Sequence, residues 1–161
     1  MGNGKKRVLV SACLLGVNCR YDGKNGKNDE VLGLMDEFEL IPVCPEQLGG
    51  METPRKPSER QQGEGAICVK NNGGEDVTAH YVRGAGETLK LARLYGCQYA
   101  VLKERSPSCG SGVIYDGTFS GKKIPGDGVT AELLKANGIV TVGESGIGEL
   151  KRLIEEAGTV E

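Results

Sequence analysis

The sequence predicts an α/β fold with a mostly parallel central sheet and helices on both of its faces. Short apolar runs alternate along the chain with longer segments in which apolar residues recur at helical spacing. This alternation is typical of strands joined by crossover helices. No internal repeat or low-complexity linker divides the 161 residues, so we expect residues 1–161 to form a single domain.

The first third of the chain predicts a strand, a helix, a second strand and a long loop. Residues 7–12, RVLVSA, form the first apolar run. Residues 29–38 predict a helix, since their apolar positions share one helical face and Asn28 is suited to cap the first turn. Residues 39–43, ELIPV, predict the second strand. The segment 44–65 holds three prolines and little periodicity, and a loop of that length in a compact domain is usually functional or disordered.

The middle of the chain predicts a short strand at 66–70, a helix at 76–95 and a third inner strand at 98–103. Two glycines, Gly84 and Gly86, weaken the helix by about 1 kcal/mol each relative to alanine. Glycine inside a helix also allows another segment to pack closely against it.

The last third predicts a hairpin, a helix, a strand and a final helix. Residues 113–121 resemble a small hairpin that turns around an Asp-Gly pair. Asp127 is suited to cap a helix over 128–137, and residues 139–142, IVTV, predict the fourth strand of the sheet. Ser145 is suited to cap a last helix that ends near residue 157.

The composition narrows the class of protein. Charged residues make up 26% and hydrophobic residues 38% of the chain, which is typical of a globular protein, and the net charge of −2 favours no polyanionic partner. Aromatic residues make up only 4%, so a stacking surface for single-stranded nucleic acid is not expected. No apolar stretch approaches the roughly 18 residues of a membrane helix. We therefore expect a cytoplasmic protein with neither a membrane nor a nucleic acid as partner.

Three of the six cysteines follow predicted strands. Cys13, Cys44 and Cys109 come just after the apolar runs VLVSAC, LIPVC and AVLKERSPSC. In an open α/β sheet, residues beyond the carboxyl ends of the strands face one crevice, so these three thiols can meet there. Disulfides are not expected, because the protein is expected to be cytoplasmic and a chain of this length does not need them for stability. The sequence contains no CxxC pair, so a zinc ribbon is not expected either.

Three thiolates allow more than one chemistry. They can hold an iron–sulfur cube and leave one iron open, or bind zinc together with one further ligand, for which the lone His80 is a weak candidate. Alternatively, each cysteine is a small buried apolar residue. Cys19 lies near the predicted site as a supporting thiol or redox partner, whereas Cys68 and Cys97 are expected to be structural. Spacing does not decide between iron–sulfur and zinc.

Polar residues beside these cysteines are candidates for catalysis and binding. Glu46 is suited to activate water as a general base at a metal centre; alternatively, it is a surface charge on a loop or an acidic residue at the N-terminus of a helix. Ser106 and Ser108 can donate hydrogen bonds to a substrate or a cluster, or simply shape a turn. Arg55 is suited to bind a polar or anionic group of a substrate, and Tyr21 to border the crevice.

Three segments together resemble the 2-thiouracil desulfurase family, long known only as a bacterial and archaeal domain of unknown function. They are SACLLGVNCRYDG, PVCPEQLGGMETPRKPSE and VLKERSPSCGSG, and the resemblance covers about residues 8–140. It implies a Rossmann-like three-layer sandwich and a 4Fe–4S cluster. By motif match, the cluster ligands are Cys13, Cys44 and Cys109, and the catalytic residues are Glu46 and Ser106.

The resemblance also implies a reaction. An enzyme of this family removes sulfur from a small thiolated nucleobase or nucleotide of the 2-thiouracil type, using the open iron of the three-cysteine cluster. The reaction is hydrolytic and involves no net redox change: water, assisted by Glu46, attacks the carbon, and Ser106 assists proton transfer or holds the base. The alternatives are an iron–sulfur module that carries sulfide or senses redox state without turnover, and a structural zinc protein.

Overall fold

A parallel sheet of four strands forms the centre of the computed structural model, which describes residues 5–63 and 65–160. In sheet order, the strands are β2 (Glu39–Val43), β1 (Arg7–Ser11), β5 (Tyr99–Leu102) and β8 (Val140–Gly143). Val8 of β1 lies opposite Leu40 of β2 on one side and Tyr99 of β5 on the other. Because β1 is an inner strand with both faces covered, its three central residues are completely buried.

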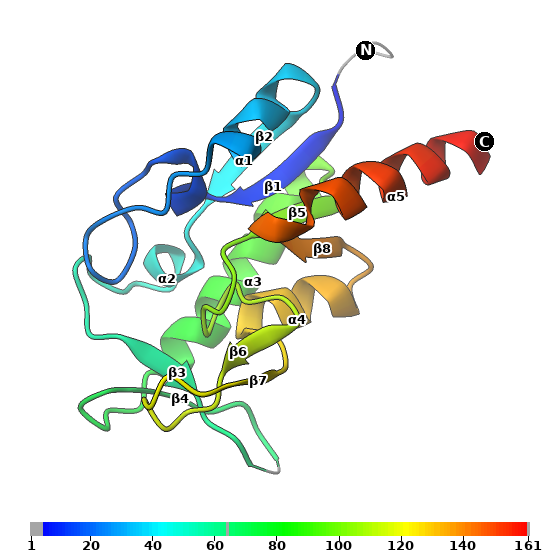
Figure 1. The fold of residues 1–161 in the computed structure, drawn as a ribbon. Coiled ribbons are helices and arrows are strands. Elements are labelled where there is room, and N and C mark those ends of the chain that lie inside the picture. Colours follow the sequence, from blue (N-terminus) through cyan, green and yellow to red (C-terminus); the bar gives the residue numbers. More distant parts are fainter. Residues whose placement is uncertain (1–4, 64, 161) are drawn as a thin grey trace.

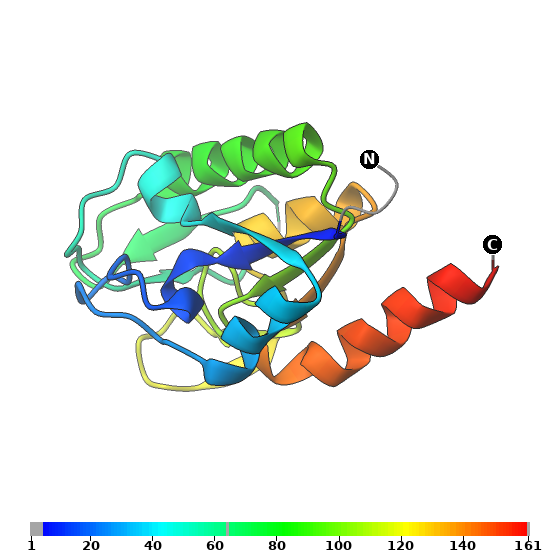
Figure 2. The same cartoon turned by 90° about the horizontal axis from the view of Figure 1, so that it is seen from above.

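Helices cover both faces of this sheet (Figures 1 and 2). The helices on one face are α3 (Thr78–Tyr95) and α4 (Val129–Ala136), and those on the other are α1 (Asp29–Gly33) and α5 (Ile147–Val160). Alternate residues of β1 point to opposite layers, since Leu9 packs with the α3 and α4 side and Val8 with the α1 and α5 side. The predicted three-layer α/β fold is thereby confirmed. Within the described residues, no helix has the length and apolar character needed to cross a membrane.

Two small antiparallel hairpins lie at the end of the molecule opposite the two termini (Figure 1). They are formed by β3 (Ser58–Arg60) with β4 (Val69–Asn71), and by β6 (Val113–Tyr115) with β7 (Lys123–Pro125). The hairpin predicted around the Asp-Gly pair is therefore present. The segment 44–65, predicted as a long loop, instead contains the short helix α2 (Pro45–Leu48) and the strand β3. Neither element shows a periodicity in sequence, because each is too short to repeat one.

The start of α4 differs from the sequence prediction. Asp127 does not cap the helix, because carbonyl groups of a preceding loop already accept hydrogen bonds from its first N–H groups. The Val129 N–H donates to the Pro107 carbonyl and the Thr130 N–H to the Ser108 carbonyl, both at 2.8 Å. This capping joins α4 to the loop that follows β5, and it fixes the backbone of that loop.

A pair of glycines lets α2 lie directly on α3. A Cβ atom on Gly84 of α3 would lie 2.0 Å from the Pro45 carbonyl oxygen, and one on Gly49 would lie 2.0 Å from the His80 carbonyl oxygen. By contrast, a Cβ atom on Gly86 would meet nothing within 4 Å. The close packing of α2 on α3 therefore requires glycine at position 84 but not at position 86. This contact fixes the position of Pro45, where α2 begins.

Candidate active site

A cavity of about 540 Å³ opens beyond the carboxyl ends of the sheet strands. Its walls come from the turns that follow β1, β2 and β5 and from the two hairpins. The residues singled out in the sequence that line it are Cys13, Cys19, Tyr21, Cys44, Glu46, Arg55, Ser106 and Cys109. Groups separated by almost a hundred positions in the sequence thus share one small volume.

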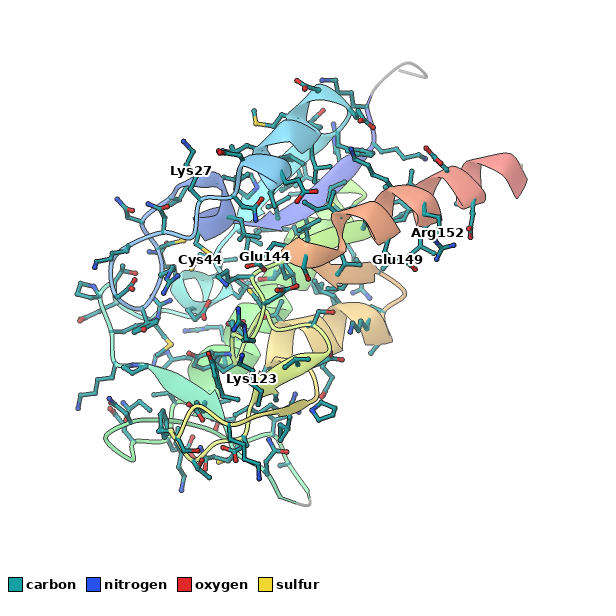
Figure 3. All side chains as sticks on the ribbon, in the orientation of Figure 1. Lys27, Cys44, Lys123, Glu144, Glu149 and Arg152 are labelled. Carbon is teal, nitrogen blue, oxygen red and sulfur yellow. The ribbon has the colours of Figure 1, made fainter. Side chains whose placement is uncertain are left out.

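Each of the three strand-end cysteines occupies the turn that leaves its own strand. Cys13 lies in a 3-10 turn, Ala12–Leu15, directly after β1. Cys44 connects β2 to α2 and is the residue that precedes the first turn of that helix (Figure 3). Cys109 lies in the loop after β5 that α4 holds in place. Cys13 and Cys109 are buried and Cys44 is half-buried, so the thiols face the cavity from protected positions.

In the absence of a bound cation, the surroundings of the Cys19, Cys44 and Cys109 thiols favour their protonated form. Burial, followed by the negative charge of Glu46, raises the pKa of Cys109 well above its ordinary value. The neighbouring Cys19, together with burial, raises the pKa of Cys44. Hydrogen bonding to Cys13 raises the pKa of Cys19 to about 11. A cationic metal group would reverse this preference, because it stabilises thiolates and releases their protons.

The donors around the cavity can be compared with what a single metal ion and an iron–sulfur cluster each require. In residues 5–63 and 65–160, no group of three or more His, Cys, Asp or Glu side chains is placed to hold one metal ion. His80 lies on α3, where its ring Nδ1 is 2.8 Å from the Gly49 carbonyl oxygen, and it is not among the residues that line the cavity. Cysteine ligands of an iron–sulfur cluster bind different irons, so thiols on three separate turns around one cavity fit such a cluster.

Glu46 brings a nearly buried carboxylate to the same cavity. It lies in the first turn of α2, and its Oε1 atom is 3.9 Å from the Cys44 Sγ atom. Its Oε2 atom is 3.9 Å from an Arg55 guanidinium nitrogen, and both side chains are at most 12% exposed. The same guanidinium donates hydrogen bonds of 3.1 Å to the carbonyl oxygens of Cys19 and Glu52. Arg55 therefore connects two segments of the wall to the loop at Glu52 and holds the carboxylate near the thiols.

The Ser106 hydroxyl can still donate a hydrogen bond to a group bound in the cavity. Its Oγ atom accepts hydrogen bonds of 3.1 Å from the backbone N–H groups of Ser108 and Cys109. A serine hydroxyl accepts two hydrogen bonds and donates one, so what remains is its capacity to donate. Ser108 is completely buried, its hydroxyl bonds that of Thr130 at 2.7 Å, and it does not line the cavity. This corrects the expectation that Ser108 binds the substrate.

The other residues named from the sequence differ in whether they line the cavity. Tyr21 lines the cavity and is 43% exposed, with the guanidinium carbon of Arg20 5.7 Å from its ring centre. Cys19 also lines the cavity, whereas Cys68 and Cys97 are absent from its walls. Cys97 is buried in the core under α3 and α4, as expected for a structural residue.

Several residues of the cavity were not identified from the sequence. They are Ser11, Ser58, Tyr81, Lys103, Glu104, Arg105, Tyr115 and Phe119, whereas Glu59, which also lines the cavity, stands in the sequence beside Arg55 as a candidate for binding a polar group. Lys103 forms an ion pair of 2.9 Å with Glu144, which Figure 3 labels. Several of the others come from β3 and from the β6–β7 hairpin. The hairpin itself was predicted, but nothing in its sequence shows that it packs beside the strand ends.

Comparisons with known proteins show what this chain is similar to. A family model described as 2-thiouracil desulfurase matches residues 8–145. YbbK of Bacillus subtilis (strain 168) is 45% identical over 149 residues, which cover 89% of this chain and 99% of that protein. The solved structure of TudS, a 4Fe–4S-dependent thiouracil desulfidase, is 43% identical, with a TM-score of 0.86 over 94% of this chain and 99% of that one.

Proposed function

The chain belongs to the 2-thiouracil desulfurase family, and on that premise we propose that it removes sulfur from a thiolated nucleobase or nucleotide with the help of a 4Fe–4S cluster. The observation that carries this proposal is the shared cavity, in which three thiols meet a nearly buried carboxylate and a donating hydroxyl. In this proposal, Cys13, Cys44 and Cys109 bind the cluster and leave one iron without a protein ligand.

The proposed reaction is a hydrolysis. The thiocarbonyl carbon exchanges its sulfur for the oxygen of a water molecule, the two protons of water leave with the sulfur as hydrogen sulfide, and no electrons are transferred. When bound, the cluster supplies an open iron that acts as a Lewis acid toward a soft sulfur atom. The residues of the chain must then bind the base, move the protons and limit the access of bulk water.

The carboxylate and the hydroxyl are assigned separate tasks in this scheme. Glu46 accepts a proton from the attacking water, because it is an acceptor at the cavity wall that Arg55 holds in position. Ser106 donates its remaining hydrogen bond to a polar atom of the base, since its two acceptor positions are already used by backbone N–H groups. Both residues line the cavity with the thiols, so one bound base can reach all of them.

The direct test is anaerobic reconstitution with iron and sulfide, followed by incubation with 2-thiouracil and with a thiolated nucleotide. We expect about four irons per chain and equal amounts of sulfide and desulfurated product. A protein that binds iron and sulfide but releases no sulfide from either substrate would support the carrier or sensor alternative instead. A protein that takes up zinc and no iron would contradict the cluster.

A further inference from the structure

The loop at the tip of the β6–β7 hairpin presents an aromatic side chain to the cavity at a conformational cost. Phe119 lines the cavity with 39% of its surface exposed, and its backbone φ is +57°. Residues with a side chain rarely adopt this left-handed conformation, and bulky residues adopt it least. Among the described residues other than glycine, only Arg105 shares a positive φ, and it lines the same cavity. Backbone conformations of this kind concentrate at functional sites.

A carboxylate of the other hairpin fixes this loop. The Oε1 atom of Glu59, on β3, accepts hydrogen bonds from the backbone N–H groups of Gly117 at 2.9 Å and of Phe119 at 3.1 Å. The Gln61 side-chain amide donates to the Gly117 carbonyl at 3.2 Å. A Cβ atom on Gly117 would lie 3.0 Å from the Arg60 carbonyl oxygen, so the loop lies directly on the backbone of β3. The aromatic ring is therefore held at the cavity by a defined support.

The cavity collects aromatic side chains in a chain that has few. The sequence contains five tyrosines, two phenylalanines and no tryptophan. In the described structure, Tyr21, Tyr81, Tyr115 and Phe119 all line this cavity. Tyr81 is buried, but Tyr21 and Phe119 are more than a third exposed, so packing in the core does not account for them. An exposed ring on a cavity wall is suited to stack on a planar heteroaromatic ring.

We propose that Phe119 stacks on the ring of the substrate and that Glu59 is the positioning residue that holds Phe119 in place. This inference rests on the proposed function, since it takes the substrate to be a planar thiolated base. Stacking uses only the faces of the ring, so the edge that carries the sulfur remains free to approach the thiols, Glu46 and Ser106. The hairpin then determines which ring binds, while the strand ends carry the chemistry.

A single introduced tryptophan can report this contact directly. Because the chain has no tryptophan, Phe119→Trp places one fluorophore in the cavity of the cluster-loaded protein. Tyr95→Trp is the matched control, since Tyr95 is also 39% exposed but lies at the end of α3, away from the cavity. Uracil, which has no sulfur to lose, is the probe. We expect it to quench the indole emission of the Phe119→Trp variant saturably and to leave the emission of the Tyr95→Trp control unchanged.

The kinetics of the cluster-loaded enzyme distinguish stacking by Phe119 from the positioning of Phe119 by Glu59. We expect Phe119→Ala to raise KM for 2-thiouracil about ten-fold, with kcat and iron content unchanged, and Phe119→Tyr to keep the normal KM. Glu59→Ala should raise KM similarly. Glu59→Gln keeps a carbonyl oxygen that can accept the same hydrogen bonds, so its KM should equal that of wild type. Because both act through one contact, the double variant Glu59→Ala with Phe119→Ala should be no worse than Phe119→Ala alone.

The outcomes distinguish the two proposals. If wild type converts 2-thiouracil but uracil leaves the Phe119→Trp variant unquenched and Phe119→Ala has a normal KM, stacking is wrong. If Glu59→Gln is as impaired as Glu59→Ala, Glu59 acts through its charge, and the positioning role is wrong. If the loaded wild type releases no sulfide at all, the proposed function fails, whereas quenching of the Phe119→Trp variant by uracil still reports whether the ring binds there.

Discussion

The cavity has two walls that differ in construction. The cysteine wall consists of the turns after β1, β2 and β5 that carry Cys13, Cys44 and Cys109; the hairpin wall consists of β3 and the 116–122 loop. The cysteine wall grows from the central sheet, in which β1 and β5 are inner strands with almost completely buried side chains and β2 is an edge strand. The hairpin wall rests on three-residue strands and a few side-chain hydrogen bonds. Groups that need exact mutual placement thus lie on the rigid sheet, and ring recognition lies on a lighter support.

The largest expected effect comes from removing one of the proposed cluster ligands of the cysteine wall. We expect Cys109→Ser to lose the cluster and all measurable sulfide release, because two thiols cannot replace three. Cys97→Ser is the matched control, since Cys97 is also buried but lies away from the cavity. Iron and sulfide content and activity with 2-thiouracil are measured on both. Full iron content and activity in Cys109→Ser would show that the cysteine wall does not hold the cluster.

The next effect separates chemistry from metal binding within the cysteine wall. Glu46→Gln keeps the size of the side chain but removes the proton acceptor, so we expect kcat to fall about 100-fold or more with the iron content retained. Glu52→Gln is the control, because Glu52 is an exposed carboxylate nearby that does not line the cavity. Normal turnover in Glu46→Gln would contradict its role as the base.

A pair of glycines tests how firmly the cysteine wall is supported. We expect Gly84→Ala to lower the free energy of unfolding by about 2 to 3 kcal/mol, because the added methyl group would press on the α2 backbone. In the same helix, a Cβ atom on Gly86 would meet nothing within 4 Å, so Gly86→Ala should raise the free energy of unfolding by about 0.5 to 1 kcal/mol. Denaturant unfolding of the two variants measures the difference. Equal effects would mean that α2 does not depend on this contact.

The smallest expected effect is a dependence of stability on pH at the end of β5. Burial raises the pKa of Glu104, but hydrogen bonds from Ser145 and the charges of Lys103 and Arg105 outweigh it, so the pKa lies below its ordinary value of 4.5. A lowered pKa stabilises the fold above the ordinary value, and that contribution is lost as the pH falls through the folded-state value.

We therefore expect Glu104→Gln to be less stable than wild type by about 1 kcal/mol at about pH 7, and the difference to shrink as the pH falls through the folded-state pKa of Glu104. Denaturant unfolding at neutral and at acidic pH measures this. A stability difference that is the same at both would show that the charge of Glu104 contributes nothing.

The sequence predicts the cysteine wall far better than the hairpin wall. The strand over residues 39–43 has the predicted bounds, because a parallel strand of this sheet is a short apolar run that ends sharply at a polar turn. The position of Cys13 and Cys44 after such runs then follows from sheet topology alone. Phe119 gives no comparable signal, and Glu59 stands out only as a charged neighbour of Arg55, since the contact between the two residues depends on how two short hairpins pack. The sequence also does not distinguish the two serines of the turn: Ser106 lines the cavity, whereas the hydroxyl of Ser108 bonds that of Thr130 in the interior.

The capping of α4 by the loop after β5 also sets an order of events during synthesis. The carbonyl groups of Pro107 and Ser108 are held by N–H groups of residues 129–131, so the backbone around Cys109 is secured only after that helix exists. β1 must likewise wait for β5 to emerge before it is paired on both sides. Most of the chain must therefore be synthesised before the backbone around Cys109 is secured. With Cys109 as a proposed ligand, cluster insertion would be a late step in the maturation of this protein.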